Sequence, residues 1–508
     1  MSRRGPLLLR ALLFACLLGL ALPAAVAPAD AVPRQATVVT AQPKPNPHRA
    51  GRAQRVLDNV TDLLNGLTSP TKVHRDLSLQ LRDLVQLKDA LSPADRARAN
   101  RLLARPTGNP NYCYDATCYK GDDRQICNDT LCVHWVPAGE DPRNAPKSLR
   151  YVHQVLKTVS RIDRKYVAAG YRKPMSDRGR GGNDKPDIYL AQIGDQGLYG
   201  YCAPEGPRHV QHGSMWGYCV LDNNYTEAAF SAHSPLQNMK VTAAHEFFHD
   251  VQFAMDAGEN SWFMEATATW AEDMVFDKIN DNAYYLPYGP LANPQIPINS
   301  FTGLFQYGDW IFFRYLTDRY DTETAGMNDL ILKMWKACAG QDATHNSLRA
   351  IERSLGEDGT NLPDELARFS AGSRRPQETY HAEVIEVAKQ GIKYPKAPLQ
   401  ASKRVHLSGP TTVSASYKHL SAKTYRFTAR HAGNLTFDLS FGTAGTAGRA
   451  VIVTKVAGSP VTKQLVTTGG PQTPIAYDPN TTKWVEVTIV DGKTSGHDTE
   501  GLTATLAP

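Results

Sequence analysis

Several features that would assign a class at once are missing from this sequence. Past residue 31, no apolar run reaches the length of about 20 residues that a membrane span needs. The net charge of +6 is small for 508 residues, and no basic cluster is interleaved with aromatic residues, so nothing favours nucleic-acid binding. The glycine-rich stretch 176–186 follows no predicted strand and precedes no helix, which excludes a phosphate-binding loop there. No internal repeat is evident.

The composition that remains is typical of a soluble globular protein. The chain is 42% hydrophobic and 21% charged, and its 508 residues exceed what one hydrophobic core usually serves. We therefore expect two or three domains, which is large enough for an enzyme.

The first 31 residues read as a secretory signal peptide. Arg3, Arg4 and Arg10 supply the positive end, ALLFACLLGLALPAAVA supplies an apolar core of 17 residues, and small residues surround a cleavage point after Ala31. An uncleaved membrane anchor is the alternative, but this core is short for a span of about 20 residues. The sequence therefore predicts a secreted, extracellular protein with no membrane span in its mature chain.

Seven cysteines remain after signal removal, and in an exported protein they favour disulfides. The first four lie close together, so two disulfides are expected, with a structural zinc site as the alternative and all three pairings open. Cys202 and Cys219 occur in similar contexts and predict a third bridge between neighbouring strands. Cys338 is then expected to be a buried thiol. The first four are Cys113, Cys118, Cys127 and Cys132.

Residues 32–110 predict a helical leader. Residues 32–55 are rich in proline, alanine, arginine and glutamine, which is typical of a flexible segment. Residues 55–105 then space leucine and valine three and four apart, and SPADRARANRLL begins with a serine cap followed by proline. In an exported hydrolase this segment is a candidate propeptide, and an accessory helical subdomain is the alternative.

The sequence pattern changes again after residue 110. Residues 111–394 mix short strand-like runs with helices, and 240–372 read as almost wholly helical. From 395 to 508, threonine, valine and serine alternate with other residues between turn signals, which predicts a β-sandwich. The expected fold class is α+β, with a sheet lobe and a helical lobe between the N-terminal helices and the sandwich.

One short motif carries chemistry. HEFFH, within VTAAHEFFHDVQFAMD, places His245 and His249 four residues apart, so on a helix both imidazoles project from one face. A buried helix that holds two histidines by accident is the alternative, because Phe247 and Phe248 are core-type residues. Since the motif is rare by chance, two ligands of one Zn²⁺ ion are favoured.

A catalytic zinc ion usually has three protein ligands and one open position. NSWFMEATATWAEDMVFDKI predicts a second helix, capped by Asn260 or Ser261, that carries Glu265. Glu265 lies sixteen residues after His249, which is far enough for the first helix to end and for the chain to return to it. Three alanines keep the second helix slim enough to pack closely on the first. Glu265 is therefore the expected third ligand.

Glu246 stands beside His245, where a general base is needed. Two neutral histidines and one carboxylate leave Zn²⁺ with a net positive charge, which lowers the pKa of a bound water toward about 7. Glu246 is expected to take the proton of that water and pass it to the departing amine. Tyr307, in QYG before a predicted helix, is the first candidate to stabilise the oxyanion, with Tyr285 and Tyr288 as alternatives.

Metal-binding imidazoles also need a partner on their second ring nitrogen. Glu272 shares a helix face with Glu265 and is one candidate. Gln252 shares a face with both histidines and is expected to touch substrate or the loop above. Other candidate partners are Asp250, Thr269 and Asp273; the histidines without paired spacing, among them His209, His212 and His233, are assigned surface or structural roles.

These segments resemble a known group of enzymes. TAAHEFFHDVQF followed by WFMEATATWAED is similar to gluzincin-type zinc metallopeptidases, in particular a secreted bacterial set with a consensus close to H-E-F-F-H-x-x-Q and W-F-x-E-x-x-A-x-W. GYRKP, DIYLAQIG, YGYCAP and QYGDWIFFRYL extend the resemblance over roughly residues 130–375. It implies a two-lobed, zincin-like domain at 111–394, with His245, His249 and Glu265 holding zinc and Glu246 as the base.

The resemblance also implies that an edge strand of the sheet holds an extended peptide over the site. The strand-like runs 187–193 and 217–224 are the candidates. One departure concerns the third-ligand helix, because thermolysin-like enzymes read E-x-x-x-D there, with an aspartate that braces a ligand histidine. This sequence has Thr269 at that position, so the bracing residue is open.

The favoured interpretation is a secreted zinc endopeptidase that acts on protein or peptide substrates. A zinc exopeptidase on the same site would need a group that anchors a free amine or carboxylate, and none is evident. A protein of another class would use the β-sandwich to bind a polymer or cell-surface ligand, with an inert metallopeptidase-like part. All three expected zinc ligands and the expected base Glu246 are present, which argues against a catalytically inert protein.

Overall fold

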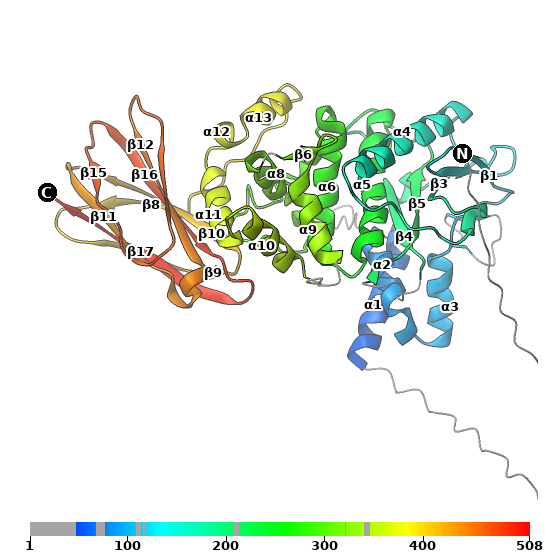
Figure 1. The fold of residues 1–508 in the computed structure, drawn as a ribbon, viewed down its shortest axis with the longest axis horizontal. Helices are drawn as coiled ribbons and strands as arrows, with labels where there is room; N and C mark the ends of the chain where they lie inside the picture. Colours follow the sequence, from blue (N-terminus) through cyan, green and yellow to red (C-terminus); the bar gives the residue numbers. More distant parts are fainter. Residues whose placement is uncertain are drawn as a thin grey trace, which may run out of the picture. The chain divides into compact units, whose positions relative to one another are not determined.

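The computed structural model describes residues 47–67, 77–107, 113–114, 117–206, 213–320, 322–339 and 346–508 (Figure 1). The expected signal peptide, the start of the leader up to residue 46, and His209 and His212 lie outside the described residues. None of the helices in the described part of the chain combines the length and apolar content that crossing a membrane requires. The chain mixes helices with sheets, as the α+β prediction requires at its coarsest level.

A five-stranded sheet packs against the helix that carries the motif. Its strand order is β1-β2-β3-β5-β4, so β4 forms one edge. Strands β2, β3 and β5 run parallel, whereas β1 and β4 pair antiparallel with their neighbours. The strands are β1 (Arg124–Cys127), β2 (Cys132–Trp135), β3 (Asp187–Ala191), β4 (Gly200–Pro204) and β5 (Gly217–Asp222).

The two runs predicted as the edge strand are inner strands. β3 lies between β2 and β5, and β5 lies between β3 and β4. The chain turns back after β4 and pairs antiparallel, with Cys202 opposite Cys219, which leaves β4 outermost. The edge-strand prediction for 187–193 and 217–224 was therefore wrong, and Gly200–Pro204 takes that position.

The predicted N-terminal helices form a layer on one face of this sheet. They are α1 (Pro47–Leu64), α2 (Leu77–Leu87) and α3 (Pro93–Leu102). The Ser92 side chain accepts a hydrogen bond from the Asp95 N–H at the start of α3, with Pro93 in the first turn, as the sequence predicts. Apolar residues of the three helices form one buried cluster with sheet residues that include Tyr189, Tyr201 and Tyr218. Because strand side chains alternate between faces, the neighbouring Ile188, Cys202 and Cys219 belong to the cluster on the other side.

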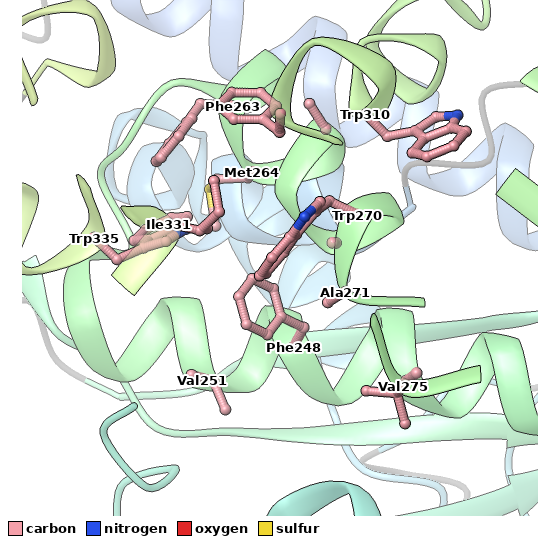
Figure 2. Close-up of a cluster of buried hydrophobic side chains, with 14 of the residues drawn as sticks. Phe248, Val251, Phe263, Met264, Trp270, Ala271, Val275, Trp310, Ile331 and Trp335 are labelled. Atoms are coloured by element: carbon pink, nitrogen blue, oxygen red, sulfur yellow. The ribbon is translucent and has the colours of Figure 1, made fainter. Parts of the chain in front are cut away.

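The motif helix α5 (Pro235–Asp256) packs on that other side, against α4 (Leu149–Ala168), the sheet and α6 (Ser261–Phe276). A capping box of Ser234 and Gln237, with proline in the first turn, explains where α5 begins. Phe248 of α5 and Trp270 of α6 belong to the same buried apolar cluster, and Figure 2 shows their rings pointing toward one another. The phenylalanine face of the motif helix is therefore core, which leaves the histidine face for chemistry.

The prediction that 240–372 is almost wholly helical was wrong between α6 and α7. Residues 277–304 form short 3-10 turns and loops, because four prolines interrupt the backbone hydrogen bonding of a helix there. The remaining elements of this region are α7 (Phe305–Gly308), α8 (Trp310–Arg319), β6 (Glu323–Thr324), β7 (Met327–Asn328), α9 (Asp329–Ala339), α10 (Ser347–Glu357), α11 (Leu362–Gly372), α12 (Pro376–Thr379) and α13 (His381–Ala388).

The C-terminal region consists of strands, as its alternating sequence predicts. One sheet has the order β13-β12-β16-β10-β8 and a second the order β14-β11-β17-β9, with β15 paired to β11. Side chains of both sheets share one buried apolar cluster, which includes Phe427 and Phe437. The strands are β8 (Ala401–Val405), β9 (Thr411–Lys418), β10 (Ser421–Ala429), β11 (Gly433–Ser440), β12 (Gly448–Val456), β13 (Thr462–Val466), β14 (Gly470–Pro471), β15 (Ile475–Tyr477), β16 (Thr482–Asp491) and β17 (His497–Ala507).

The cysteines pair as disulfides. The three bridges are Cys113–Cys118, Cys127–Cys132 and Cys202–Cys219. The prediction of a bridge between neighbouring strands at Cys202 and Cys219 is confirmed. Among the first four cysteines, whose pairing the sequence left open, each bridge joins two cysteines that are consecutive in the sequence. Cys338 is free and buried, also as predicted.

A buried ion cluster joins the N-terminal helical layer to the sheet. Arg105 follows α3, and its Nη2 lies 2.6 Å from Asp177 Oδ2 and 2.7 Å from Glu205 Oε2. Its Nη1 contacts Asp187, which is fully buried at the start of β3. One guanidinium therefore bridges three carboxylates that the fold removes from water, and His134 contacts Asp187 as well.

Replacing Arg105 with leucine should lower the free energy of unfolding by about 3–5 kcal/mol, because the buried carboxylates lose their counter-ion. Arg98→Leu is the matched control, since Arg98 is 39% exposed and lies 3.8 Å from Asp58. That change should cost less than about 1 kcal/mol. Urea unfolding of both variants measures the difference, and equal small losses would contradict this account of the cluster.

Candidate metal centre

Helices α5 and α6 bring two histidines and a glutamate together. The Nε2 atoms of His245 and His249 are 3.1 Å apart. Glu265 Oε2 lies 3.1 Å from Nε2 of His245, and Glu265 Oε1 lies 3.6 Å from Nε2 of His249. One donor atom from each residue lies within 4.8 Å of the other two. The structure thus unites the three residues that the sequence predicts as ligands.

This donor set fits a metal ion. Two ligands bonded at about 2.0–2.1 Å to a tetrahedral zinc stand about 3.3 Å apart, close to the observed separations. Glu265 is fully buried, yet its Oε1 accepts no hydrogen bond. A buried carboxylate oxygen without a partner is costly unless a cation compensates it. The group can therefore bind a metal ion, and histidine with carboxylate suits several divalent transition metals.

The electrostatics of the cluster favour positive charge at this point. Burial raises the pKa of Glu265, but the neighbouring His249 and His245 outweigh it and lower that pKa to about 2. Burial lowers the pKa of His245, whereas hydrogen bonds with Glu265 and Glu272 raise it well above its ordinary value. An ionised carboxylate beside two imidazoles attracts a proton or a metal cation to the same nitrogens.

Each imidazole is anchored through its second nitrogen. His245 Nδ1 is 2.6 Å from Glu272 Oε1, and His249 Nδ1 is 2.7 Å from Gln252 Oε1. The Gln252 amide nitrogen donates to the Met264 carbonyl at 2.9 Å, which holds its oxygen toward the imidazole. With Nδ1–H donating to these oxygens, the lone pair of each Nε2 faces the ligand cluster.

These anchors correct one expectation and narrow another. Gln252 is fully buried and orients His249, so the expected contact with substrate was wrong. Of the sequence candidates, Glu272 braces a histidine, two helical turns beyond Glu265, and thereby takes the role that Thr269 cannot fill. In the described structure no hydrogen bond joins Asp250 or Thr269 to either imidazole, and Asp273 instead binds Arg314 and Asn282.

Glu246 borders a pocket together with His245. Gly200 at the start of β4 and Thr242 of α5 line the same pocket. Burial raises the pKa of the Glu246 carboxyl, and the charges of His245 and His249 oppose that rise. The predicted base therefore stands one residue from a ligand and has access to the pocket.

Tyr307 also lines this pocket, from α7. Its ring centroid is 6.0 Å from that of His245 and 5.1 Å from that of Tyr285, another lining residue. Tyr288 is 51% exposed and does not line the described pocket. The structure thus brings two of the three candidate tyrosines to the site, and Tyr307 stacks on Tyr285 while its ring is tilted toward His245.

One contact of Glu246 comes from a part of the chain that the sequence did not connect to the site. Ser78 Oγ in α2 donates to Glu246 Oε2 at 2.7 Å. The two residues are 168 positions apart, and no local pattern links them.

No protein-family model matches this chain, and no curated protein matches it.

Replacing Gln252 with leucine should weaken the binding of added Zn²⁺, used as a probe of the candidate site, about 10–100-fold, because the His249 imidazole loses the oxygen that orients it. Gln237→Leu is the matched control at the far end of α5, where the lost capping contact affects the helix start only. Zinc affinity is measured by competition with a chromophoric chelator. Equal affinities for the wild type and Gln252→Leu would contradict the anchoring role.

Proposed function

We propose that this protein is a secreted, zinc-dependent metalloendopeptidase of the gluzincin type. The observation that supports it most is the combination of three candidate metal donors with Glu246, a carboxylate outside that donor set that borders a pocket together with His245. A purely structural metal site has all its ligands from the protein and needs no base beside it. Three disulfides accord with an oxidising, extracellular location.

The residues divide the chemistry between them. His245, His249 and Glu265 would hold the zinc, which when bound supplies Lewis acidity toward the scissile carbonyl and the attacking water. Glu246 accepts the proton of that water and returns it to the leaving amine. The Tyr307 hydroxyl donates a hydrogen bond to the carbonyl oxygen as negative charge develops on it.

The edge strand β4 supports binding of an extended peptide. Gly200 lines the pocket, and a Cβ there would stand 2.9 Å from Glu246 Cγ and 2.8 Å from Thr242 Cγ2. Glycine at this position lets the strand backbone approach the base closely. The Cys202 N–H of this strand is held by Ser78 Oγ at 2.8 Å, so a peptide would pair with the strand at its Gly200 end, next to Glu246.

The pocket favours an endopeptidase over a carboxypeptidase. None of the described residues that line it is a lysine or arginine that would bind a terminal carboxylate. Of the lining carboxylates, Glu272 contacts His245 through Oε1 and keeps Oε2 without a hydrogen-bond partner, while Asp281 lies 3.1 Å from His233. The described lining of the pocket thus holds no cation for a terminal carboxylate, which disfavours carboxypeptidase action.

We interpret the larger architecture on the same basis. The five-stranded sheet and the helices from α6 to α13 would be the two lobes of a zincin-like domain, with α5 between them. The two C-terminal sheets around one apolar cluster would be the β-sandwich, available to bind a polymer or a cell-surface ligand.

Glu246→Gln should keep zinc and lose proteolysis by about 10²–10⁴-fold, because the amide cannot accept the proton. Glu265→Gln is the contrasting variant, which should lose zinc as well. Metal content by mass spectrometry and casein cleavage, with and without a chelator, measure both. Full activity in Glu246→Gln, or chelator-resistant cleavage by the wild type, would overturn the proposed function.

Tyr307→Phe should lower kcat by about 10–10³-fold with little change in KM, because the hydrogen bond to the oxyanion forms only during the reaction. Tyr288→Phe removes a hydroxyl outside the pocket and should leave kcat unchanged. Steady-state kinetics on a fluorogenic peptide compare the two. If Tyr307→Phe behaves like the control, Tyr285 becomes the candidate.

A further inference from the structure

We infer that the N-terminal helical layer, α1 to α3, remains in the mature enzyme, and that its Ser78 is a positioning residue for Glu246. The second statement rests on the proposed function, whereas the first does not. Neither follows from the sequence, which left a removable propeptide and an accessory subdomain as equal alternatives.

The contact that carries the inference is a bridge through one buried hydroxyl. Ser78 lies in the first turn of α2 and is 2% exposed. Its Oγ donates to Glu246 Oε2 at 2.7 Å and accepts from the backbone N–H of Cys202, in the edge strand β4, at 2.8 Å. The Ser78 hydroxyl has one proton, and its oxygen already accepts the Cys202 N–H. That one proton is therefore donated to the Glu246 carboxylate.

This bridge restricts the orientation of the base. With Oε2 engaged by Ser78, Oε1 is the oxygen left to accept a proton in the pocket. A carboxylate without this contact would be free to turn about its last torsion, which is broad for glutamate. Ser78 therefore acts on the reaction through the geometry of Glu246 rather than through substrate.

The same helix supports the turn between the ligand-bearing helices. Arg82 Nη1 donates to the Glu259 carbonyl at 2.8 Å, and Arg82 Nη2 donates to Ser261 Oγ at 2.7 Å. Gln86 donates to the Ala257 carbonyl at 3.0 Å. The three contacted residues lie where α5 connects to α6. By holding this connection, α2 helps to position Glu265 against the two histidines.

Loss of the layer would also expose what it covers. The sheet would present an apolar face with Tyr189, Tyr201 and Tyr218, and Asp177, Asp187 and Glu205 would lose Arg105. Both changes are unfavourable, because the first returns apolar area to water and the second leaves buried carboxylates unpaired. The layer is therefore built as a permanent part of the fold.

The decisive variant is Ser78→Ala, compared with Ser160→Ala. Ser160 is also buried, and its hydroxyl likewise donates once, to the Leu156 carbonyl at 2.6 Å, and accepts once, from Asn128 at 2.5 Å, but it lies on α4 outside the pocket. Ser78→Ala should lower kcat about 10–100-fold with KM and zinc content within twofold of the wild type. Ser160→Ala should leave kcat unchanged, and Ser78→Thr, which keeps a hydroxyl, should recover most of the loss.

Equal kcat in Ser78→Ala and the wild type, or equal losses in both alanine variants, would overturn the positioning role. The intact mass of the secreted, active protein tests the layer separately. A mature chain that contains Leu77–Leu87 supports the inference, and one that lacks this helix overturns it. A zinc-loaded wild type that cleaves no protein substrate would instead overturn the proposed function and the role of Ser78 with it, while the mass would still decide the fate of the layer.

Discussion

The arrangement of the site depends on one buried carboxylate. Glu265 has no exposed surface, remains ionised beside two imidazoles, and keeps one oxygen without a hydrogen-bond donor. Such a group is tolerated only where the surrounding protein concentrates positive charge on it. The close packing of α6 on α5, the orientation of both histidines and the anchors behind them all serve that requirement. Buried apolar side chains of the same helices, among them Phe248 and Trp270, make this packing favourable (Figure 2).

Buried charge is balanced by residues from distant parts of the chain. Arg105 pairs with three acidic groups at the sheet, and Arg82 donates to a carbonyl at the turn between α5 and α6. Both arginines come from the N-terminal segment, although their partners belong to the region that holds the metal donors. The helical layer and the site are thus joined by ionic and polar contacts as well as by apolar packing.

Local chemistry was predictable from the sequence, whereas long-range pairing was not. The four-residue spacing of His245 and His249, the helix that returns Glu265 and the serine cap of α3 depend on neighbours along the chain, so their patterns are visible in it. The predicted side-chain cap of the Glu265 helix was wrong, because Asn260 stands at the N-cap position but accepts a hydrogen bond from Ser347 instead. The edge position of β4 depends on which strands pair, and strand order is not written in any one strand. Gln252 was predicted to contact substrate, because nothing in the sequence shows that a glutamine on the histidine face is buried. Its burial depends on the packing of α6, to which it donates a hydrogen bond. Ser78 could not be found, because a serine in a leucine-rich helix has nothing that points to a residue 168 positions away.

The distance of α2 from its partners along the chain also constrains the order in which the protein can assemble. Ser78 meets Glu246 across 168 positions, and Arg82 meets Met264 across 182. During synthesis the helix is complete long before these partners exist, and closing loops of this length is slow compared with forming a helix. Glu246 gains the Ser78 hydrogen bond, and the turn between α5 and α6 gains its Arg82 and Gln86 contacts, only when the two ends of this long loop meet. The final geometry of the candidate site is therefore a late product of folding.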